Sequence, residues 1–210
     1  MLGDVVVVLI AYLLGSIPFA YVITRVFSGK DIRIEGDGNV GTRNVLHVVG
    51  LVPGLLTSVL DTGKGAAAYW VGRRWGSADW VVYLAGFALM LGHGFPVWLG
   101  WRGGKGLASA TGFLLQMWPY SVLGAAIVFV VAHAVIAKFS PAYAVAAAAL
   151  PLFTYWEGND LKGLLFIALL LGMAGAKRLI DLPRERAVLS RGAVTEDQAG
   201  PAAAQSQHTR

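Results

Sequence analysis

Long apolar segments separated by short polar loops run through most of the chain. The segments are too continuous for the residue-by-residue alternation of a membrane barrel, and helices are then the spanning elements that satisfy the backbone in lipid. The pattern predicts an all-α fold, a polytopic integral membrane bundle of about seven transmembrane helices. We place these helices at 5–27, 45–72, 80–99, 107–118, 120–137, 140–156 and 161–180.

Two of the predicted helices are irregular. The second contains Pro53 and the polar run Asp-Thr-Gly-Lys-Gly at 61–65, so we expect it to be broken or partly re-entrant. The fourth is short for a full span. Five spans are the alternative to seven, if 107–137 forms one long helix and the spans within 140–180 are miscounted.

Basic residues gather in alternate loops, whereas the loop 157–162 has two acidic residues against one lysine. The positive-inside tendency therefore predicts the N-terminus outside and the C-terminus inside, with Arg73 and Arg74 discordant on the outer side. We predict one transmembrane domain, 1–191, in the cell (inner or plasma) membrane with its site toward the cytoplasm. The polar tail 192–210 lacks apolar periodicity and is predicted to be disordered. The basic segments are 25–43, 102–105, 138 and 177–191.

Composition supports a membrane protein and excludes several kinds of site. Of 210 residues, 56% are hydrophobic and only 14% are charged, whereas soluble domains carry about a quarter charged residues. The absence of cysteine excludes disulfides, zinc–thiolate sites and iron–sulfur clusters. The net charge of +5 resides at the ends of apolar runs, which fits lipid headgroups better than nucleic acid.

The polar segment 92–106 is the most informative for chemistry. It places glycines, a histidine and two cations at the predicted cytoplasmic end of the third helix. Glycines let backbone N–H groups approach an oxyanion, and the helix start at Leu107 adds its positive dipole end. The spacing is not that of a Walker loop, and an ordinary tight turn with membrane anchors is the alternative. The candidate residues are His93, Arg102, Gly103, Gly104, Lys105 and Gly106.

Two further segments carry polar groups toward the same region. Alternating glycines at 36–41 form a candidate anion-binding nest before a helix, with a capped turn as the alternative. Asp61 and Lys64 lie at membrane depth, where ionisable residues are costly and usually face a cavity or a partner. A purely structural pair on one helix face is the alternative there. The candidates in the first segment are Gly36, Asp37, Gly38, Asn39, Gly41, Arg43 and Asn44.

These blocks resemble, in order, those of the bacterial acyl-phosphate-dependent glycerol-3-phosphate acyltransferases, integral membrane enzymes that begin phospholipid synthesis. A further match is the run Gly-Ser-Ile-Pro-Phe-Ala-Tyr at 15–21, and 138–140 occupies the place of a basic–aromatic–serine element. The resemblance implies acyl transfer from acyl phosphate to the 1-hydroxyl of glycerol 3-phosphate, giving lysophosphatidic acid and phosphate at the lipid bilayer. It implies no cofactor, no metal, no nucleic acid and no covalent enzyme intermediate.

The resemblance also implies the roles of the candidate residues. The implied catalytic residues are Asp37, Asn39, His93 and Lys105. The implied substrate-binding residues are Gly36, Gly38, Gly41, Arg43, Asn44, Asp61, Lys64, Arg102, Gly103, Gly104, Gly106 and Ser140.

The chain departs from the family pattern at functional positions. Asp37 replaces a serine, His47 replaces an arginine, and the segment at Gly172 lacks a histidine and an asparagine. A non-catalytic or altered-substrate relative that binds a phosphorylated or acylated ligand is therefore the alternative function. We expect Asp37 and Arg43 to pair. The other possibilities are that Arg43 alone binds phosphate, or that Asp37 binds a substrate hydroxyl or acts as a base.

Overall fold

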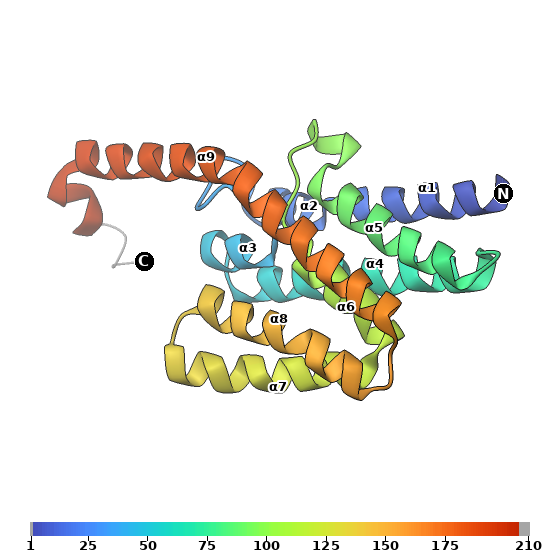
Figure 1. Cartoon of the computed structure of the whole chain (residues 1–210). Coiled ribbons are helices and arrows are strands. Elements are labelled where there is room, and N and C mark those ends of the chain that lie inside the picture. Colours follow the sequence, from blue (N-terminus) through green and yellow to red (C-terminus); the bar gives the residue numbers. More distant parts are fainter. Residues whose placement is uncertain (1, 206–210) are drawn as a thin grey trace.

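The computed structural model describes the backbone of residues 2–205 and the side chains of residues 2–191. The described residues form helices and loops without strands, which confirms the predicted all-α fold (Figure 1). In chain order the elements are α1 (Leu2–Ser16), α2 (Phe19–Ser28), α3 (Thr42–Val48), α4 (Leu51–Trp75), α5 (Asp79–Gly94), the 3₁₀ turn η1 (Val97–Leu99), α6 (Leu107–Met117), α7 (Pro119–Ile136), α8 (Phe139–Trp156) and α9 (Leu161–Gln205).

Small residues allow the central helices to pack closely. A Cβ added at Gly15 of α1 would lie 2.2 Å from the Leu89 carbonyl oxygen of α5. A Cβ at Gly65 of α4 would lie 2.0 Å from the Ser109 carbonyl oxygen of α6. Glycines at such contacts let helix backbones approach each other, which is how helices associate in lipid without a hydrophobic driving force. The α1–α5 and α4–α6 pairs therefore form the rigid centre of the molecule.

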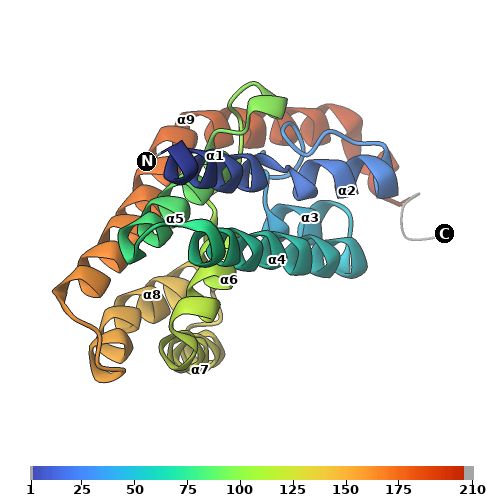
Figure 2. The same cartoon turned by 90° about the vertical axis from the view of Figure 1, so that its right-hand side faces the viewer.

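An aromatic core joins this centre to α9, while α7 and α8 pair beside it (Figures 1 and 2). Phe113 is fully buried, and its ring lies 5.6 Å from the Tyr69 ring and 6.0 Å from the Phe166 ring. Large apolar side chains on the outer surfaces are exposed, as expected for residues that face lipid rather than water. They include Leu9, Val59, Ile127, Val131, Leu152 and Leu165.

Two predicted helices are divided in the structure. The segment 5–27 divides into α1 and α2 at Pro18, whose ring removes a backbone N–H. The segment 45–72 divides into α3 and α4 at Gly50, which has a left-handed φ of +122°. The predicted break of this second segment is therefore confirmed, but it lies at Gly50 and not in the polar run 61–65, through which α4 is continuous. Pro53 causes no break, since it is the third residue of α4, where the backbone N–H has no partner within the helix.

Four helical stretches of the described residues are long and apolar enough to cross a membrane. The eleven residues of α6 are short for a span, as predicted. The count of seven spans stays a prediction, because α4 and α8 are long helices that do not belong to these four. The four stretches are Leu2–Ser28, Asp79–Leu99, Pro119–Ile136 and Leu161–Arg191.

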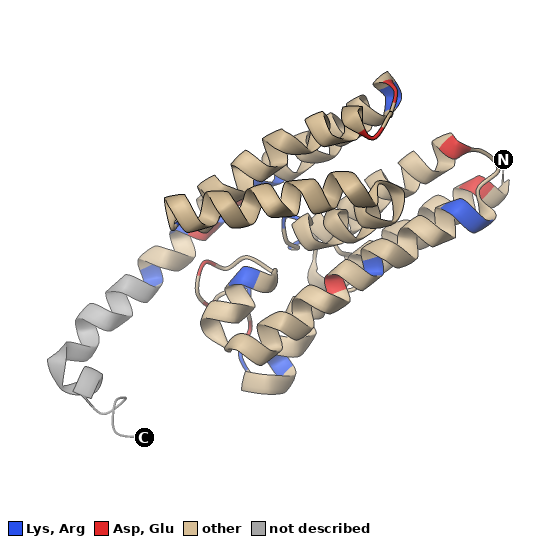
Figure 3. Cartoon of the chain, turned by 90° about the horizontal axis from the view of Figure 1, so that it is seen from below, with Lys and Arg blue, Asp and Glu red and all other residues tan. Residues whose placement is uncertain are grey.

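The helices run roughly antiparallel, so that the polar loops gather at two opposite ends. Figure 1 shows the start of α1 beside the α4–α5 turn at one end, with α3, the α7–α8 turn and the late part of α9 toward the other. Figure 3 shows Lys, Arg, Asp and Glu gathered mainly toward the helix ends. The tail 192–210 begins within α9, but its side chains lie outside the described residues, so its predicted disorder stays a prediction.

Candidate active site

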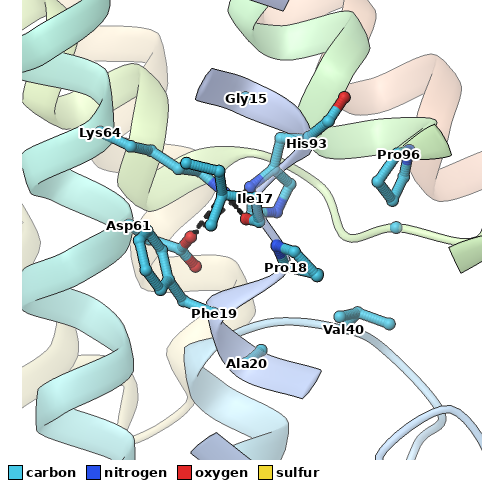
Figure 4. A pocket seen from close by; sticks show the side chains of 12 residues that line it. Gly15, Ile17, Pro18, Phe19, Ala20, Val40, Asp61, Lys64, His93 and Pro96 are labelled. Carbon is cyan, nitrogen blue, oxygen red and sulfur yellow. Dashed lines mark hydrogen bonds and ion pairs between the residues drawn. The ribbon is translucent and has the colours of Figure 1, made fainter. Parts of the chain in front are cut away.

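The break between α1 and α2 creates a polar point deep in the protein. Pro18 cannot continue the hydrogen bonds of α1. The Ile17 carbonyl oxygen instead accepts a hydrogen bond from Lys64 Nζ of α4, at 2.8 Å (Figure 4). The same ammonium forms an ion pair with Asp61 Oδ1 at 2.7 Å, and the two side chains are only 3% and 2% exposed. The structural pair that the sequence allows as the alternative for Asp61 and Lys64 is therefore present, with a backbone oxygen as a third partner, and their predicted substrate-binding role stays a prediction.

His93 joins this pair from α5. Its Nδ1 lies 3.2 Å from Ser109 Oγ of α6 and 3.9 Å from Asp61 Oδ1. A proton on Nδ1 would let His93 donate to Ser109 Oγ and would face the Asp61 carboxylate, with the lone pair then on Nε2. Three helices thus contribute four polar side chains to a buried cluster: Asp61 and Lys64 from α4, His93 from α5 and Ser109 from α6.

The glycine segment 103–106 packs directly against His93. The Gly103 and Gly104 amides donate to the carbonyl oxygens of Gly94 and His93, at 3.1 and 3.2 Å. A Cβ at Gly104 would lie 2.3 Å from the Val40 carbonyl oxygen and 2.6 Å from His93 Nε2. Only glycine fits where this segment passes between the histidine and the 36–41 loop. The two glycine-rich segments are therefore in contact, which agrees with the prediction that both lie at the same end of the bundle.

Lys105 and Arg102 differ in their surroundings. Lys105 Nζ lies 2.9 Å from Glu185 Oε1 of α9, and its side chain is partly buried. Arg102 is exposed at the surface. Gly106 has a left-handed φ of +78° and precedes the first turn of α6, so the loop delivers Lys105 next to a helix N-terminus. Of the two cations predicted here, Lys105 is the one held inside the structure.

The 36–41 loop is organised by the side chain of Asn44. Its Nδ2 donates to the carbonyl oxygens of Ile32, Glu35 and Asn39, at 3.3, 2.9 and 3.0 Å. Its Oδ1 accepts from the Asp37 amide at 3.1 Å. Asn44 therefore holds the loop backbone in shape. The Asn39 side chain is buried, and its Oδ1 has no hydrogen-bond partner among the described residues.

The expected pair of Asp37 and Arg43 is wrong. Asp37 Oδ1 accepts from the Asn39 amide at 3.0 Å, so the aspartate closes its own turn. Arg43 Nη1 donates to Ser140 Oγ at 3.2 Å, and its guanidinium lies 5.6 Å from the centre of the Phe139 ring. Arg43 lies in the first turn of α3 and reaches α8, far along the chain. The structure thus brings Arg43 together with Ser140 instead.

An apolar cavity of about 260 Å³ lies between α6, α7, α8 and α9. Its lining contacts the candidate site residues at two places. Met90 lines it and packs on Gly106, where a Cβ would lie 2.7 Å from Met90 Sδ. Phe139 also lines it and carries the Arg43 guanidinium. A second, much smaller cavity of about 10 Å³ touches the α1–α2 break and has room for roughly one water. The large cavity is lined by Met90, Leu107, Ala110, Thr111, Leu114, Val122, Ala125, Ala126, Phe129, Phe139, Tyr143, Ala146, Ala147, Leu150, Ile167, Leu170, Leu171 and Ala174.

Sequence reasoning missed three residues that support these segments. Tyr12 donates from its hydroxyl to the Phe95 carbonyl oxygen at 2.8 Å, Ser109 contacts His93, and Glu185 contacts Lys105. Tyr12 and Ser109 lie within apolar helices and carry no distinguishing local pattern. Glu185 does stand out as the acidic residue between Arg184 and Arg186.

The fold and the site define a helical membrane protein with a buried charged cluster and glycine-rich loops beside an apolar cavity. The chain belongs to the glycerol-3-phosphate acyltransferase family, whose model matches residues 5–180. The expected resemblance is thereby confirmed.

Individual relatives agree with the family assignment. The chain is 45% identical over 151 residues to a glycerol-3-phosphate acyltransferase of Jannaschia sp. (strain CCS1), covering 71% of this chain and 73% of that one. It is 41% identical over 174 residues to that of Rhizobium meliloti (strain 1021), covering 82% and 84%. Two crystal structures of PlsY, an integral membrane glycerol 3-phosphate acyltransferase, are similar. The glycerol 3-phosphate form has a TM-score of 0.78 at 31% identity and the lysophosphatidic acid form 0.73 at 30%, each covering 86% of this chain and 90% of that one.

Proposed function

We propose that this protein transfers an acyl group from acyl phosphate to the 1-hydroxyl of glycerol 3-phosphate in phospholipid synthesis. The observation that carries the proposal is the contact between the buried polar cluster, the glycine-rich loops and the large apolar cavity. A reaction between a phosphorylated polyol and an acyl donor needs all three in one place. The solved relatives with glycerol 3-phosphate and lysophosphatidic acid support the acceptor and the product.

The acyl donor fits the apolar cavity. Its chain would lie between α6, α7, α8 and α9, where the lining is almost entirely apolar. Its phosphate would lie at the rim near Arg43 and Ser140, whose contact places a cation and a hydroxyl beside the lining residue Phe139. Glycerol 3-phosphate would bind at the glycine-rich loops, near Lys105 and the start of α6.

The chemistry is a direct acyl transfer. The 1-hydroxyl oxygen forms an ester bond with the acyl carbonyl carbon, and the bond from that carbon to the phosphate oxygen breaks. Phosphate leaves with the bonding electron pair, and the hydroxyl proton passes to a base. His93 Nε2 is suited to accept the proton, because Ser109 and Asp61 lie on the Nδ1 side. Lys105 and loop amides would stabilise the developing negative charge.

The site would face the cytoplasm from a single transmembrane domain, 1–191, in the cell membrane. Supporting this, the glycine-rich loops contact the basic late part of α9: a Cβ at Gly38 would lie 3.0 Å from Val188, and Lys105 pairs with Glu185. The acidic turn between α8 and α9 lies at the opposite end. The positive-inside tendency then places the N-terminus outside.

The direct test is turnover by purified protein in lipid nanodiscs with palmitoyl phosphate and glycerol 3-phosphate. We expect lysophosphatidic acid and inorganic phosphate in equal amounts. His93→Gln should lower kcat by about a hundredfold or more, the usual contribution of a general base. His133→Gln is the matched control, because His133 is exposed on α7 and stacks only on Phe129 among the ring contacts. Binding of palmitoyl phosphate by the wild type without turnover would instead support the non-catalytic relative.

A further inference from the structure

The late part of α9 carries a charged face. Lys177, Asp181, Arg184 and Glu185 follow the spacing of four, three and one residues that places side chains on one side of a helix. Lys177 Nζ donates to Asp181 Oδ1 at 2.6 Å, and Arg184 Nη2 lies 3.3 Å from the same oxygen. Asp181 therefore joins Lys177 and Arg184 in one group, and Glu185 follows on the same face of the helix.

This charged face lies against the candidate active site. A Cβ at Gly94 would lie 3.3 Å from Lys177 Cε, and the Lys177 ammonium lies 5.1 Å from the centre of the Phe95 ring. About two turns beyond Lys177, Glu185 contacts Lys105. Figure 2 shows α9 passing the loops on this side of the bundle. A Cβ at Gly38 would lie 3.0 Å from Val188, so α9 also touches the 36–41 loop.

The charges of this group do not balance. Three cations, Lys105, Lys177 and Arg184, face two carboxylates, Asp181 and Glu185. Asp181 is shared between two cations, while Glu185 pairs with one. The side chains of Lys177 and Asp181 are only 6% and 4% exposed, so solvent screens the excess charge poorly. A partly buried group with a net positive charge favours binding of an anion.

Arg184 also has unused donors. Its Nε and Nη2 atoms are buried and have no hydrogen-bond acceptor among the described residues, although Nη2 lies in ion-pair range of Asp181. Buried donors without an acceptor are rare in folded proteins and call for a water or an ion. A guanidinium presents its donors in a planar fork that matches two oxygens of a phosphate. The missing acceptor is therefore best supplied by a phosphate group.

We propose that Arg184 binds the phosphate group of a substrate, alongside Lys105 and under the cover of α9. The proposal deepens the proposed function and rests on it for the identity of the ligand, either a phosphate monoester or an acyl phosphate. Both substrates carry this chemistry, so the experiment below separates them. The residue lies outside the glycine-rich segments that the sequence singles out.

The test compares Arg184→Gln with Arg186→Gln. Both variants remove one positive charge from the same turn of α9, but Arg186 is exposed. In nanodiscs, the Kd for glycerol 3-phosphate alone and for palmitoyl phosphate alone would be measured by thermophoresis. Arg184→Gln should raise one Kd by on the order of tenfold to a hundredfold, the loss of a charge-assisted hydrogen bond. Arg186→Gln should change both by less than about threefold, as for exposed charges.

The substrate whose Kd rises identifies the phosphate that Arg184 holds. Equal, small changes in Arg184→Gln and Arg186→Gln for both substrates would overturn the proposal. Should Arg184→Gln fail to fold, the same measurements compare Arg184→Lys with Arg186→Lys, because lysine keeps the charge but lacks the planar fork of the guanidinium. Only Arg184→Lys should then weaken binding. A wild type that binds both substrates without acyl transfer would refute the proposed function and leave this test valid, and one that binds neither would refute both.

Discussion

A single methyl group at position 104 should disable the protein by separating its two glycine-rich segments. In Gly104→Ala, the new Cβ would lie 2.3 Å from the Val40 carbonyl oxygen and 2.6 Å from His93 Nε2, whereas ordinary contact begins at 3.4 Å. Either the 36–41 loop or the 103–106 segment must therefore withdraw by about 1 Å, the difference between 3.4 and 2.3 Å. A misplacement of about 1 Å lowers catalysis by on the order of a hundredfold.

The assay is steady-state formation of lysophosphatidic acid in nanodiscs, with kcat/KM measured for glycerol 3-phosphate. The control is Gly63→Ala in α4, where an added Cβ has nothing within 4 Å. The control should retain activity, while Gly104→Ala should lose about a hundredfold in kcat/KM. Thermal unfolding of both variants separates local displacement from general misfolding. Full activity in Gly104→Ala would refute the packing of the two loops on His93.

Substitutions at three other contacts give further tests. Lys64→Met should lower the free energy of unfolding, measured by denaturant titration, by about 3–5 kcal/mol, because it leaves Asp61 buried and unpaired. Adding Asp61→Leu should recover part of this loss, and no recovery would contradict the ion pair. Arg43→Ala and Ser140→Ala should be non-additive in palmitoyl phosphate affinity by about 0.5–3 kcal/mol, and additive losses would refute their contact. Gly65→Ala should lower the unfolding temperature, because its Cβ would lie 2.0 Å from a backbone oxygen of α6. An unchanged unfolding temperature would show that α4 and α6 pack loosely.

The apolar pattern predicts most of the helices because each one must hide its backbone from lipid within its own segment. It does not predict the break at Pro18, because the helical hydrogen bond lost at the Ile17 carbonyl oxygen is replaced by one from Lys64 of a different helix. The same pattern predicts a break in the segment 45–72, which occurs at Gly50 and not in the charged run 61–65 of α4. There, Asp61 and Lys64 lie three residues apart on one face and neutralise each other. Charges at membrane depth therefore indicate a partner, and only the fold shows which one.

The candidate site was predictable where the signal is local. The glycines of the segment 92–106 predict a close backbone approach, and the structure places Gly104 between His93 and Val40. Partner choice was not predictable. Asp37 and Arg43 are close in sequence, yet an aspartate in a turn satisfies its own backbone, and the arginine reaches Ser140 across the bundle. No local property of α9 indicates which loop it will cover.

The large cavity has a consequence for how affinity should be expressed. Its volume is about 260 Å³, and its walls are mostly apolar side chains of helices whose outer faces carry exposed apolar residues, as expected of a protein in a bilayer. The chain of a membrane-borne acyl donor would pass from lipid into this cavity rather than from water, so the gain from burying the chain is small, because lipid tails are as apolar as the lining. Selectivity must come from the head group. Donor affinity is therefore best expressed as a mole fraction in the membrane rather than as a concentration in water. Kinetic constants measured in different detergents should not be compared directly, because each detergent gives the donor a different apolar environment to leave.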